Sequence, residues 1–267
     1  MTHESHPEVV LTQRQGAALW VTINRETRRN ALNAQVIEGI HAAVNRAAAD
    51  ATLRALILTG VGQKAFCAGA DLSNGAAVFA DTLNEPTTDF GQLARSVRAL
   101  GIPVIGRVNG DCVAGGMGLM ALCDLVIASE NARFGLPEGK VGVFPMQVLV
   151  YLRHMIHPRH VNELCLTGEL IGAQRALSMG IANDVVPYDE LDTKVNDMVR
   201  RMASMSPVAL RRGKYAISAM ESLGFHEALA FAETQITLAS RTDDAREGLA
   251  AFNEKRKPRW TVEEGKA

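Results

Sequence analysis

The distribution of apolar and polar positions divides the chain into two parts. Up to about residue 187, short apolar runs alternate with amphipathic stretches, a pattern typical of strands mixed with helices. We expect strands at residues 9–14, 17–23, 55–59, 104–108, 125–128 and 184–186. Beyond Pro187 only helical periodicity is left, and it predicts helices at about residues 188–204, 207–222, 225–241 and 243–256. This segregation predicts an α/β core followed by a helical lobe.

Several expected helices have suitable residues at their ends. Asn33 can cap a helix that extends to about Asp50, because its short side chain can accept a hydrogen bond from the first turn. Gly168 and Gly180 suit the position after a helix, where a left-handed conformation favours glycine. We therefore expect helices at residues 147–156, 159–167 and 173–179. Apolar stripes on several faces of the C-terminal helices favour association with another subunit.

The composition argues against several classes of protein. Lys and Arg number 28 while Asp and Glu number 29, so the formal net charge of −1 disfavours both a polybasic nucleic-acid binder and a strongly acidic tail. The N-terminus is polar, and no uninterrupted apolar run of about 18 residues follows it. We therefore expect a cytoplasmic protein with no nucleic-acid or membrane partner. The four cysteines lack CxxC spacing and lie in apolar sequence, which predicts buried free thiols.

Two glycine-rich loops are candidates for ligand binding. The first, residues 65–72, follows an expected strand and is expected to lead into a helix, and the second, residues 109–119, follows another strand. Glycine allows the backbone to approach a ligand closely. Two N–H groups aimed at one point would form an oxyanion hole, which stabilises charge developing on a carbonyl oxygen. A tight structural turn is the alternative interpretation of the first loop.

A dinucleotide site is a competing interpretation of the second loop. Residues 116–121 fit the pattern GxGxxA. That pattern should follow a strand directly, yet about seven residues separate it from the expected strand at 104–108. The acidic residue expected about 20 positions on is also misplaced, because Glu130 is only 14 residues past Gly116. Both observations argue against a dinucleotide.

Glu138 is the best candidate for acid–base chemistry. It lies in an apolar loop rich in glycine and proline, where burial can raise the pKa of a carboxyl group. The alternative is an ordinary surface glutamate. Asp124 follows an apolar run and fits a buried structural carboxylate better. We expect no metal site, because the only regular spacing of histidines is interrupted by Pro158 and no carboxylate or cysteine completes a ligand set.

Taken together, the motifs resemble the enoyl-CoA hydratase/isomerase (crotonase) superfamily along nearly the whole chain. The matching segments, in order, are residues 24–33, 65–72 (AFCAGADL), 109–124, 134–138 and 252–258. The resemblance implies an α/β fold, a crotonase-like spiral of ββα units over residues 1–200 that carries the acyl-CoA site. It also implies a helical trimerisation lobe over residues 201–267, with assembly as a homotrimer or a dimer of trimers.

The resemblance also implies a set of site residues. The N–H groups of Ala70 and Gly115 would form the oxyanion hole around a thioester carbonyl, with Glu138 as the catalytic acid/base. The remaining residues would bind the coenzyme A part of the substrate, and no separate cofactor is implied. Ala68, Ala70, Asp71, Leu72 and Gly115 would line the pantetheine and adenine, while Arg25, Arg28, Lys255 and Lys257 are candidates for the phosphates.

The chain departs from the two-glutamate hydratases of this superfamily at an informative position. Their first glutamate falls three residues after the oxyanion glycine, where this chain has Gly118. Their second falls 23 residues after that glycine and corresponds to Glu138. Some dehalogenase and isomerase members carry an Asp where this chain has Met146, and Glu26 replaces a common proline. The chain therefore has one glutamate of the usual pair.

One carboxylate leaves several functions open. It can add water to a 2-enoyl-CoA thioester by holding the water and returning its proton to C2, and this hydratase activity is our primary expectation. It can also move a proton between C2 and C4 of a 3-enoyl-CoA, which is a Δ3-Δ2 isomerase activity. A non-catalytic acyl-CoA-binding or RNA-associated protein is the alternative of another class. Apolar candidates for the acyl pocket, each equally suited to the core, are Phe79, Phe90, Phe144 and Met146.

Overall fold

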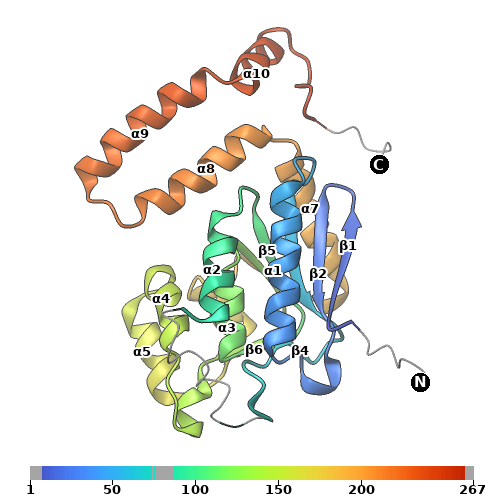
Figure 1. The fold of residues 1–267 in the computed structure, drawn as a ribbon, viewed down its shortest axis with the longest axis vertical. Coiled ribbons are helices and arrows are strands. Elements are labelled where there is room, and N and C mark those ends of the chain that lie inside the picture. The colour runs from blue at the N-terminus through green and yellow to red at the C-terminus, as the bar shows by residue number, and fades with distance from the viewer. Residues whose placement is uncertain (1–7, 74, 76–86, 262–267) are drawn as a thin grey trace.

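A computed structural model describes residues 8–73, 75 and 87–261 (Figure 1). The strands are β1 (Val10–Gln15), β2 (Ala18–Ile23), β3 (Ala55–Gly60), β4 (Ala65–Cys67), β5 (Val104–Val108), β6 (Asp111–Val113), β7 (Leu125–Ser129), β8 (Arg133–Gly135), β9 (Ile171–Gly172) and β10 (Asp184–Val186). The α-helices are α1 (Ala34–Ala49), α2 (Asp89–Ala99), α3 (Gly115–Ala121), α4 (Met146–Met155), α5 (Pro158–Thr167), α6 (Ala173–Ser178), α7 (Leu191–Ala203), α8 (Pro207–Met220), α9 (Phe225–Ser240) and α10 (Asp243–Asn253). Short 3-10 helices are η1 (Glu26–Arg28), η3 (Pro137–Val141) and η4 (Tyr188–Glu190).

The strands form two sheets that the chain visits alternately. The larger sheet has the order β1-β2-β3-β5-β7-β10 and the smaller one β4-β6-β8-β9. Strands β2, β3, β5, β7 and β10 are parallel, and β1 completes an antiparallel hairpin with β2. After each of β3 and β5 the chain enters the smaller sheet and then a helix, so that β3-β4-α2 and β5-β6-α3 are successive turns of a spiral. The α/β spiral predicted for the N-terminal part is therefore present.

Alternating side chains bury both faces of the larger sheet. In β2, Leu19 and Val21 point into the core beneath α1, whereas Trp20 points to the opposite face. That opposite face is covered by α7, whose Leu191 and Val195 are fully buried against β2, β3, β5 and β7. Because successive side chains of a strand point to opposite faces, a strand covered on both sides is buried throughout, as β3 is.

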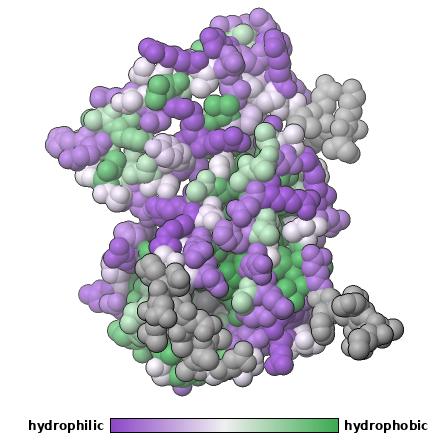
Figure 2. Space-filling view, in the orientation of Figure 1, coloured by the Kyte–Doolittle hydropathy of each residue, from purple (hydrophilic) through white to green (hydrophobic). Residues whose placement is uncertain are grey.

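The last three helices form a lobe that differs from the core in its burial. Neither α8 nor α9 has a buried residue, and in Figure 1 they extend beyond the sheet. Apolar side chains are nevertheless exposed among the hydrophilic ones on the lobe (Figure 2), and Phe225, Ile236 and Phe252 are 76%, 69% and 81% exposed. The change from buried to exposed helices occurs between the end of α7 at Ala203 and the start of α8 at Pro207, a few residues past position 200, where the sequence led us to expect the lobe to begin.

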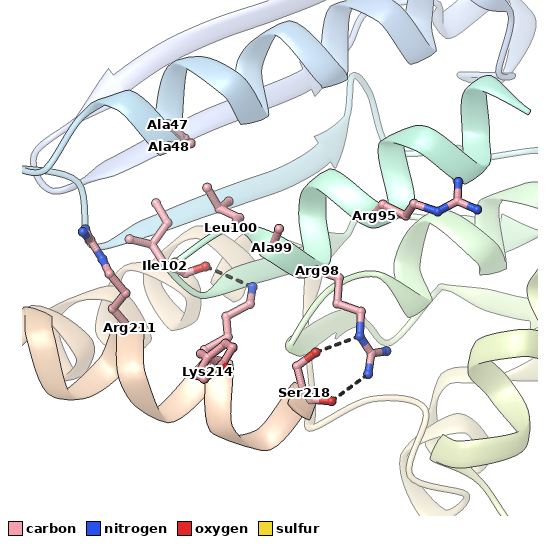
Figure 3. A pocket seen from close by; sticks show the side chains of 12 residues that line it. Ala47, Ala48, Arg95, Arg98, Ala99, Leu100, Ile102, Arg211, Lys214 and Ser218 are labelled. Carbon is pink, nitrogen blue, oxygen red and sulfur yellow. Dashed lines mark hydrogen bonds between the residues drawn. The ribbon is translucent and has the colours of Figure 1, made fainter. Parts of the chain in front are cut away.

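A groove of about 640 Å³ separates α8 from the ends of α1 and α2 (Figure 3). Its basic side chains are partly engaged: Lys214 Nζ donates to Ile102 O at 3.0 Å, and Arg98 Nε donates to Ser218 Oγ at 2.8 Å. The groove lies where α1 and α2 lead into β3 and β5, at the amino ends of these strands. It is thus at the end of the larger sheet away from the two glycine-rich loops, which follow the carboxyl ends.

Several elements were not expected from the sequence. The pattern did not predict the three-residue strands β4, β6 and β8, and it did not predict α2. At the end of the first glycine-rich loop, Leu72, Ser73 and Gly75 have 3-10 conformation, and the next described α-helix is α2. The α-helix expected directly after the loop is therefore not found among the described residues. Strand β6 also ends just before α3 begins, so a strand does precede the GxGxxA pattern of residues 116–121. The expectation that no strand lies directly before this pattern is therefore wrong, and it does not argue against a dinucleotide site.

The cysteine prediction is confirmed, since all four cysteines are buried free thiols. Within the described part of the chain, no helix combines the length and apolar character needed to cross a membrane.

Candidate active site

Three neighbouring parallel strands bring the predicted site residues to one edge of the smaller sheet. Ala70 lies three residues after β4, Gly115 two residues after β6, and Glu138 three residues after β8. The register pairs Cys67 of β4 with Cys112 of β6, which is in turn paired with Phe134 of β8. Because parallel strands end at a common edge, the loops that follow them converge there.

The two glycine-rich loops are in direct contact. A Cβ atom placed on Gly115 would lie 3.4 Å from the backbone nitrogen of Ala70, and one placed on Gly69 would lie 2.7 Å from Cβ of Ala114. There is thus no room for a side chain at Gly69, whose φ of +94° also disfavours one. Neither the Ala70 nor the Gly115 N–H donates a hydrogen bond to any described residue. Two unpaired donors on adjacent loops are what an oxyanion hole requires.

Ala114 has an unusual backbone conformation beside these donors. Its φ is +52° and its ψ is −127°, a region that residues other than glycine rarely occupy. Such a conformation costs about 1–3 kcal/mol and persists only where surrounding contacts enforce it. Here the Ala114 N–H donates to Gly135 O at 2.9 Å, and its carbonyl accepts from Met117 N at 2.9 Å. These bonds set the direction of the peptide that carries the Gly115 N–H.

The segment before α1 holds the first loop in place. The Leu32 N–H donates to Gly69 O at 2.8 Å, and the Asp71 N–H donates to Leu32 O at 2.7 Å, so residues 32 and 70 form a short parallel bridge. The Asp71 carboxylate accepts hydrogen bonds from Arg25 and from the Ser73 N–H, and these contacts, first that of Arg25, lower the pKa of Asp71 to about 2. Sequence reasoning assigned Arg25 to a ligand phosphate, whereas in the structure its guanidinium contacts the protein itself.

Two buried asparagines fix the turns beneath the site. Asn30, with φ of +56°, donates through Nδ2 to Ala65 O at 2.7 Å, while its Oδ1 accepts from Arg25 N. Asn109 donates to Gly62 O at 2.7 Å and accepts from Gly60 N at 3.2 Å. Both residues lie in the matching motifs, but sequence reasoning gave them no role. The signal was available, because buried turns need side-chain partners for their backbone groups and asparagine tolerates a positive φ.

Glu138 lies in the first turn of η3 and is half-buried. Its Oε2 atom is buried and accepts no hydrogen bond from any described residue. Burial, which disfavours the charged form, raises the pKa of this carboxyl. The buried thiol of Cys165 has its pKa raised to about 11, first by burial and then by the negative charge of Glu138, so the two groups are neighbours. A carboxylate that has a buried oxygen without a described partner and a raised pKa is suited to exchange protons with a ligand.

The position of the missing second glutamate is filled with apolar side chains. Gly118 is buried in α3, and a Cβ atom placed on it would lie 3.1 Å from Phe90 Cζ and 3.1 Å from Val148 Cγ2. Phe90 comes from α2 and Val148 from α4, so two elements close this space. Among the described residues, Glu138 is therefore the acid/base candidate at this edge, and a longer side chain at Gly118 would require both neighbours to move.

The comparisons with known proteins agree with this geometry. The enoyl-CoA hydratase/isomerase family model matches residues 13–263. The chain belongs to the enoyl-CoA hydratase/isomerase (crotonase) family. The 2,3-dehydroadipyl-CoA hydratase of Escherichia coli K12 is 35% identical over 254 residues, which cover 93% of this chain and 97% of that protein. The short-chain-enoyl-CoA hydratase of Clostridium acetobutylicum is 34% identical over 257 residues, or 93% of this chain and 95% of that protein.

Solved structures confirm the fold. The crystal structure of an enoyl-CoA hydratase from Bacillus anthracis superposes with a TM-score of 0.86 at 32% identity, covering 96% of this chain and 100% of that one. An enoyl-CoA hydratase/isomerase from Marinobacter aquaeolei gives a TM-score of 0.87 at 30% identity, with the same coverage. The α/β crotonase fold with C-terminal helices is thus confirmed. Membership in this family implies an acyl-CoA substrate.

The basic residues expected to bind coenzyme A do not all lie near the two glycine-rich loops. Arg28 is exposed on η1, close in sequence to the segment that holds the first loop. Lys255 and Lys257 are exposed and directly follow α10, which Figure 1 places at the opposite end of the molecule from β4 and β6. One chain alone does not bring these two lysines to the site.

The other expected contact residues vary in exposure. In the first loop, Ala68 and Ala70 are half-buried, whereas Leu72 is exposed. Of the candidates for the acyl pocket, Phe90 packs beside Gly118, and Met146 is 68% exposed at the start of α4. Phe144 is also exposed, and Phe79 lies outside the described residues.

Proposed function

We propose that this protein adds water to a 2-enoyl-CoA thioester, with Glu138 as its acid/base. The observation that carries the proposal is the carboxylate of Glu138, which has a buried oxygen without a described partner. Glu138 follows β8, and β8 pairs with β6, the strand that precedes Gly115. The relatives named above support the choice of hydration, because they are hydratases by name and are similar over nearly the full chain.

The reaction proceeds through an enolate. The thioester carbonyl oxygen accepts hydrogen bonds from the Ala70 and Gly115 N–H groups, which draw electron density from C3. Glu138 takes a proton from a water molecule as the water oxygen bonds to C3, and the C2–C3 π electrons move into the enolate. Glu138 then returns the proton to C2, which regenerates the carboxylate. Removing one such N–H donor typically costs about 2.7–4 kcal/mol of transition-state stabilisation.

Isomerisation of a 3-enoyl-CoA is the second candidate, and the environment of Gly118 favours it. Glu138 would remove a proton from C2 and deliver it to C4, through the same enolate, without a water molecule. Phe90 and Val148 make the place of the missing glutamate apolar, which disfavours an ordered water there. The absence of an ordered water at this place would suit isomerisation, because no water would then be positioned to add to the double bond.

Two thioesters distinguish these reactions. The protein is mixed separately with a 2-enoyl-CoA and a 3-enoyl-CoA, and the absorbance of the conjugated thioester is followed. Hydration predicts loss of absorbance from the first. A gain of absorbance from the 3-enoyl-CoA, with the 2-enoyl-CoA unchanged, would contradict hydration and support isomerisation. If neither changes, both reactions are contradicted, and an acyl-CoA-binding or RNA-associated role is tested by direct binding across a range of salt concentrations.

Replacing the carboxylate of Glu138 tests its role in either reaction. We expect Glu138→Gln to lower kcat by at least about 10²-fold while leaving the affinity for the CoA ester largely unchanged, because the amide keeps the shape but cannot exchange the proton. Glu130→Gln, at an exposed glutamate between β7 and β8, is the matched control and should keep the wild-type rate. Normal turnover by Glu138→Gln would contradict the assignment.

We further propose that the chain assembles as a homotrimer or a dimer of trimers, and that Lys255 and Lys257 reach the coenzyme A bound by another subunit. Two observations support this assembly: the exposed apolar side chains of the lobe, and the position of α10 far from the loops of its own chain. An interface between subunits would cover the exposed apolar side chains, and it would bring Lys255 and Lys257 to the site of a neighbouring subunit. Arg28, exposed near the first loop, would bind phosphate from the same chain.

A further inference from the structure

We propose that Arg25 and Asp71 are a pair of positioning residues that aim the Ala70 N–H into the oxyanion hole, an inference that rests on the proposed function. Neither residue is a catalytic residue in this role, because neither has to touch the substrate. Arg25 joins the segment before α1 to the loop after β4, and the donor lies within that loop.

The guanidinium of Arg25 spans both segments at once. Its Nη2 donates to Asp71 Oδ2 at 2.7 Å, and its Nη1 donates to Ala31 O at 2.7 Å. The side chains of Arg25 and Asp71 are only 15% and 14% exposed. A planar guanidinium presents its donors in a rigid fork, so these two bonds fix the spacing between Ala31 and Asp71.

The bonded segments determine where the Ala70 N–H points. In a trans peptide the C=O and the following N–H point in opposite directions. The Gly69 carbonyl points toward Leu32, because it accepts from Leu32 N at 2.8 Å. The Ala70 N–H therefore points away from that segment, and the Gly115 backbone lies close to its nitrogen. The Asp71 N–H donates to Leu32 O on the other side of Ala70, so the donor is held between two backbone bonds.

Arg25 ties together the ends of this short bridge. Ala31 and Asp71 flank the paired residues Leu32 and Ala70, and Arg25 contacts both flanking residues. A bridge of one residue pair has little intrinsic stability, so the side-chain tie keeps the two segments in register. With both outer nitrogens engaged inside the protein, Arg25 is not arranged to bind a phosphate, in contrast to its role expected from the sequence.

The Asp71 carboxylate stays ionised under assay conditions. Because the pKa of Asp71 is lowered to about 2, chiefly by the hydrogen bond from Arg25, its carboxylate remains charged at any pH used to measure turnover. The pH profile of the reaction should therefore report Glu138 and not this pair.

A comparison of two thioesters separates positioning from phosphate binding. Arg25→Lys and Asp71→Asn are assayed with a CoA thioester that the wild type converts, and with the N-acetylcysteamine thioester of the same acyl group, which has no phosphates. We expect each variant to lose about 10²-fold in kcat on both substrates, because a displaced donor acts on the carbonyl that both share. KM should change much less than kcat.

Two controls accompany these variants. Arg14→Lys makes the same replacement at another arginine–aspartate pair, Arg14 with Asp50 at 2.9 Å, and should keep the wild-type rate because it lies near the turn at the amino end of β2. The double variant R25K/D71N should lose no more of kcat than either single variant, because each of the three variants breaks the same contact between Arg25 and Asp71. Thermal unfolding checks that each variant is folded.

Three outcomes would overturn the proposal. A loss confined to the CoA thioester would assign Arg25 to phosphate binding. An unchanged kcat on both substrates would show that the pair does not position the donor, and additive losses in the double variant would show that the two residues act separately. If the wild type converts neither a 2-enoyl nor a 3-enoyl thioester, the proposed function fails independently. The pair is then tested by the red shift of a bound conjugated enoyl-CoA, which the variants should abolish and whose retention would contradict positioning.

Discussion

At the scale of single residues, the site combines a destabilised carboxylate with constrained backbone donors. Burial raises the pKa of Glu138, and its Oε2 has no described partner, so ionisation is less favourable in the folded chain than in the unfolded one. The same feature that suits proton exchange thus reduces the free energy of unfolding at neutral pH. A loss of stability in exchange for activity is expected where a buried carboxylate has no partner until a ligand binds.

The raised pKa of Glu138 predicts that Glu138→Gln is more stable than the wild type at pH 8. A raised pKa in the folded state means that Glu138 contributes stability below its ordinary pKa near 4.5 and loses it as pH rises through the raised value. Glutamine does not titrate, so the advantage of the variant should shrink as pH falls toward 4. Urea unfolding at both pH values measures it. A variant less stable than the wild type at pH 8 would contradict the effect of burial.

At the scale of elements, α3 is packed so closely that its glycines decide what the site can contain. A Cβ atom on Gly116 would lie 2.1 Å from the backbone oxygen of Cys67, and one on Gly118 would meet Phe90 and Val148. The contact at Gly116 is with rigid backbone, whereas those at Gly118 are with side chains of α2 and α4. Position 118 is therefore the one that can change if its neighbours change with it.

The packing predicts a strong coupling between Gly118 and Phe90. Gly118→Glu alone should lower the free energy of unfolding by about 1–3 kcal/mol or more, because overpacking adds to the burial of a charge without a described partner. Combining it with Phe90→Ala should cost less than the sum of the two single variants, since the smaller side chain makes room. Urea unfolding of all four proteins gives the coupling energy. Additive losses would show that Phe90 does not limit this position.

At the scale of the whole molecule, the lobe exposes apolar surface that a single chain does not cover. The helices α8 and α9 have no buried residue, and the exposed Phe225, Ile236 and Phe252 lie on α9 and α10. Large apolar side chains exposed on the same lobe are typical of an interface. The proposed homotrimer or dimer of trimers would bury it, and would also explain why Lys255 and Lys257 lie far from the site of their own chain.

Charged residues on this surface should dissociate the assembly. We expect the double variant Phe225→Asp with Ile236→Asp to sediment as a monomer and to bind CoA esters more weakly, because the lysines of a second subunit are lost. Leu11→Asp, at an exposed apolar residue on β1 outside the lobe, is the control and should keep the native mass. Sedimentation equilibrium measures the mass. A wild type that is itself a monomer would contradict both the interface and the shared site.

Much of the fold could be predicted from local signals. Asn33 caps α1 as expected, accepting from Val36 N at 3.0 Å, and Gly168 ends α5 with φ of +62°. These features depend on residues within one helical turn, so they are legible in the chain without its partners. The glycine-rich loops and Glu138 were likewise candidates from their local chemistry, whereas the assignment of Ala70 and Gly115 as the two donors came from the resemblance to the family.

Contacts between distant segments could not be read in the same way. The strands β4, β6 and β8 have three residues each, too few for a periodic pattern, and they exist because they pair with one another. Arg25 pairs with a residue 46 positions away, so its sequence neighbours say nothing about whether it meets a phosphate or Asp71. The apolar surroundings of Gly118 also come from two other helices. Local chemistry therefore specified most of the longer elements and the candidate groups, whereas long-range packing formed the short strands and set the partner, the direction and the space of each group.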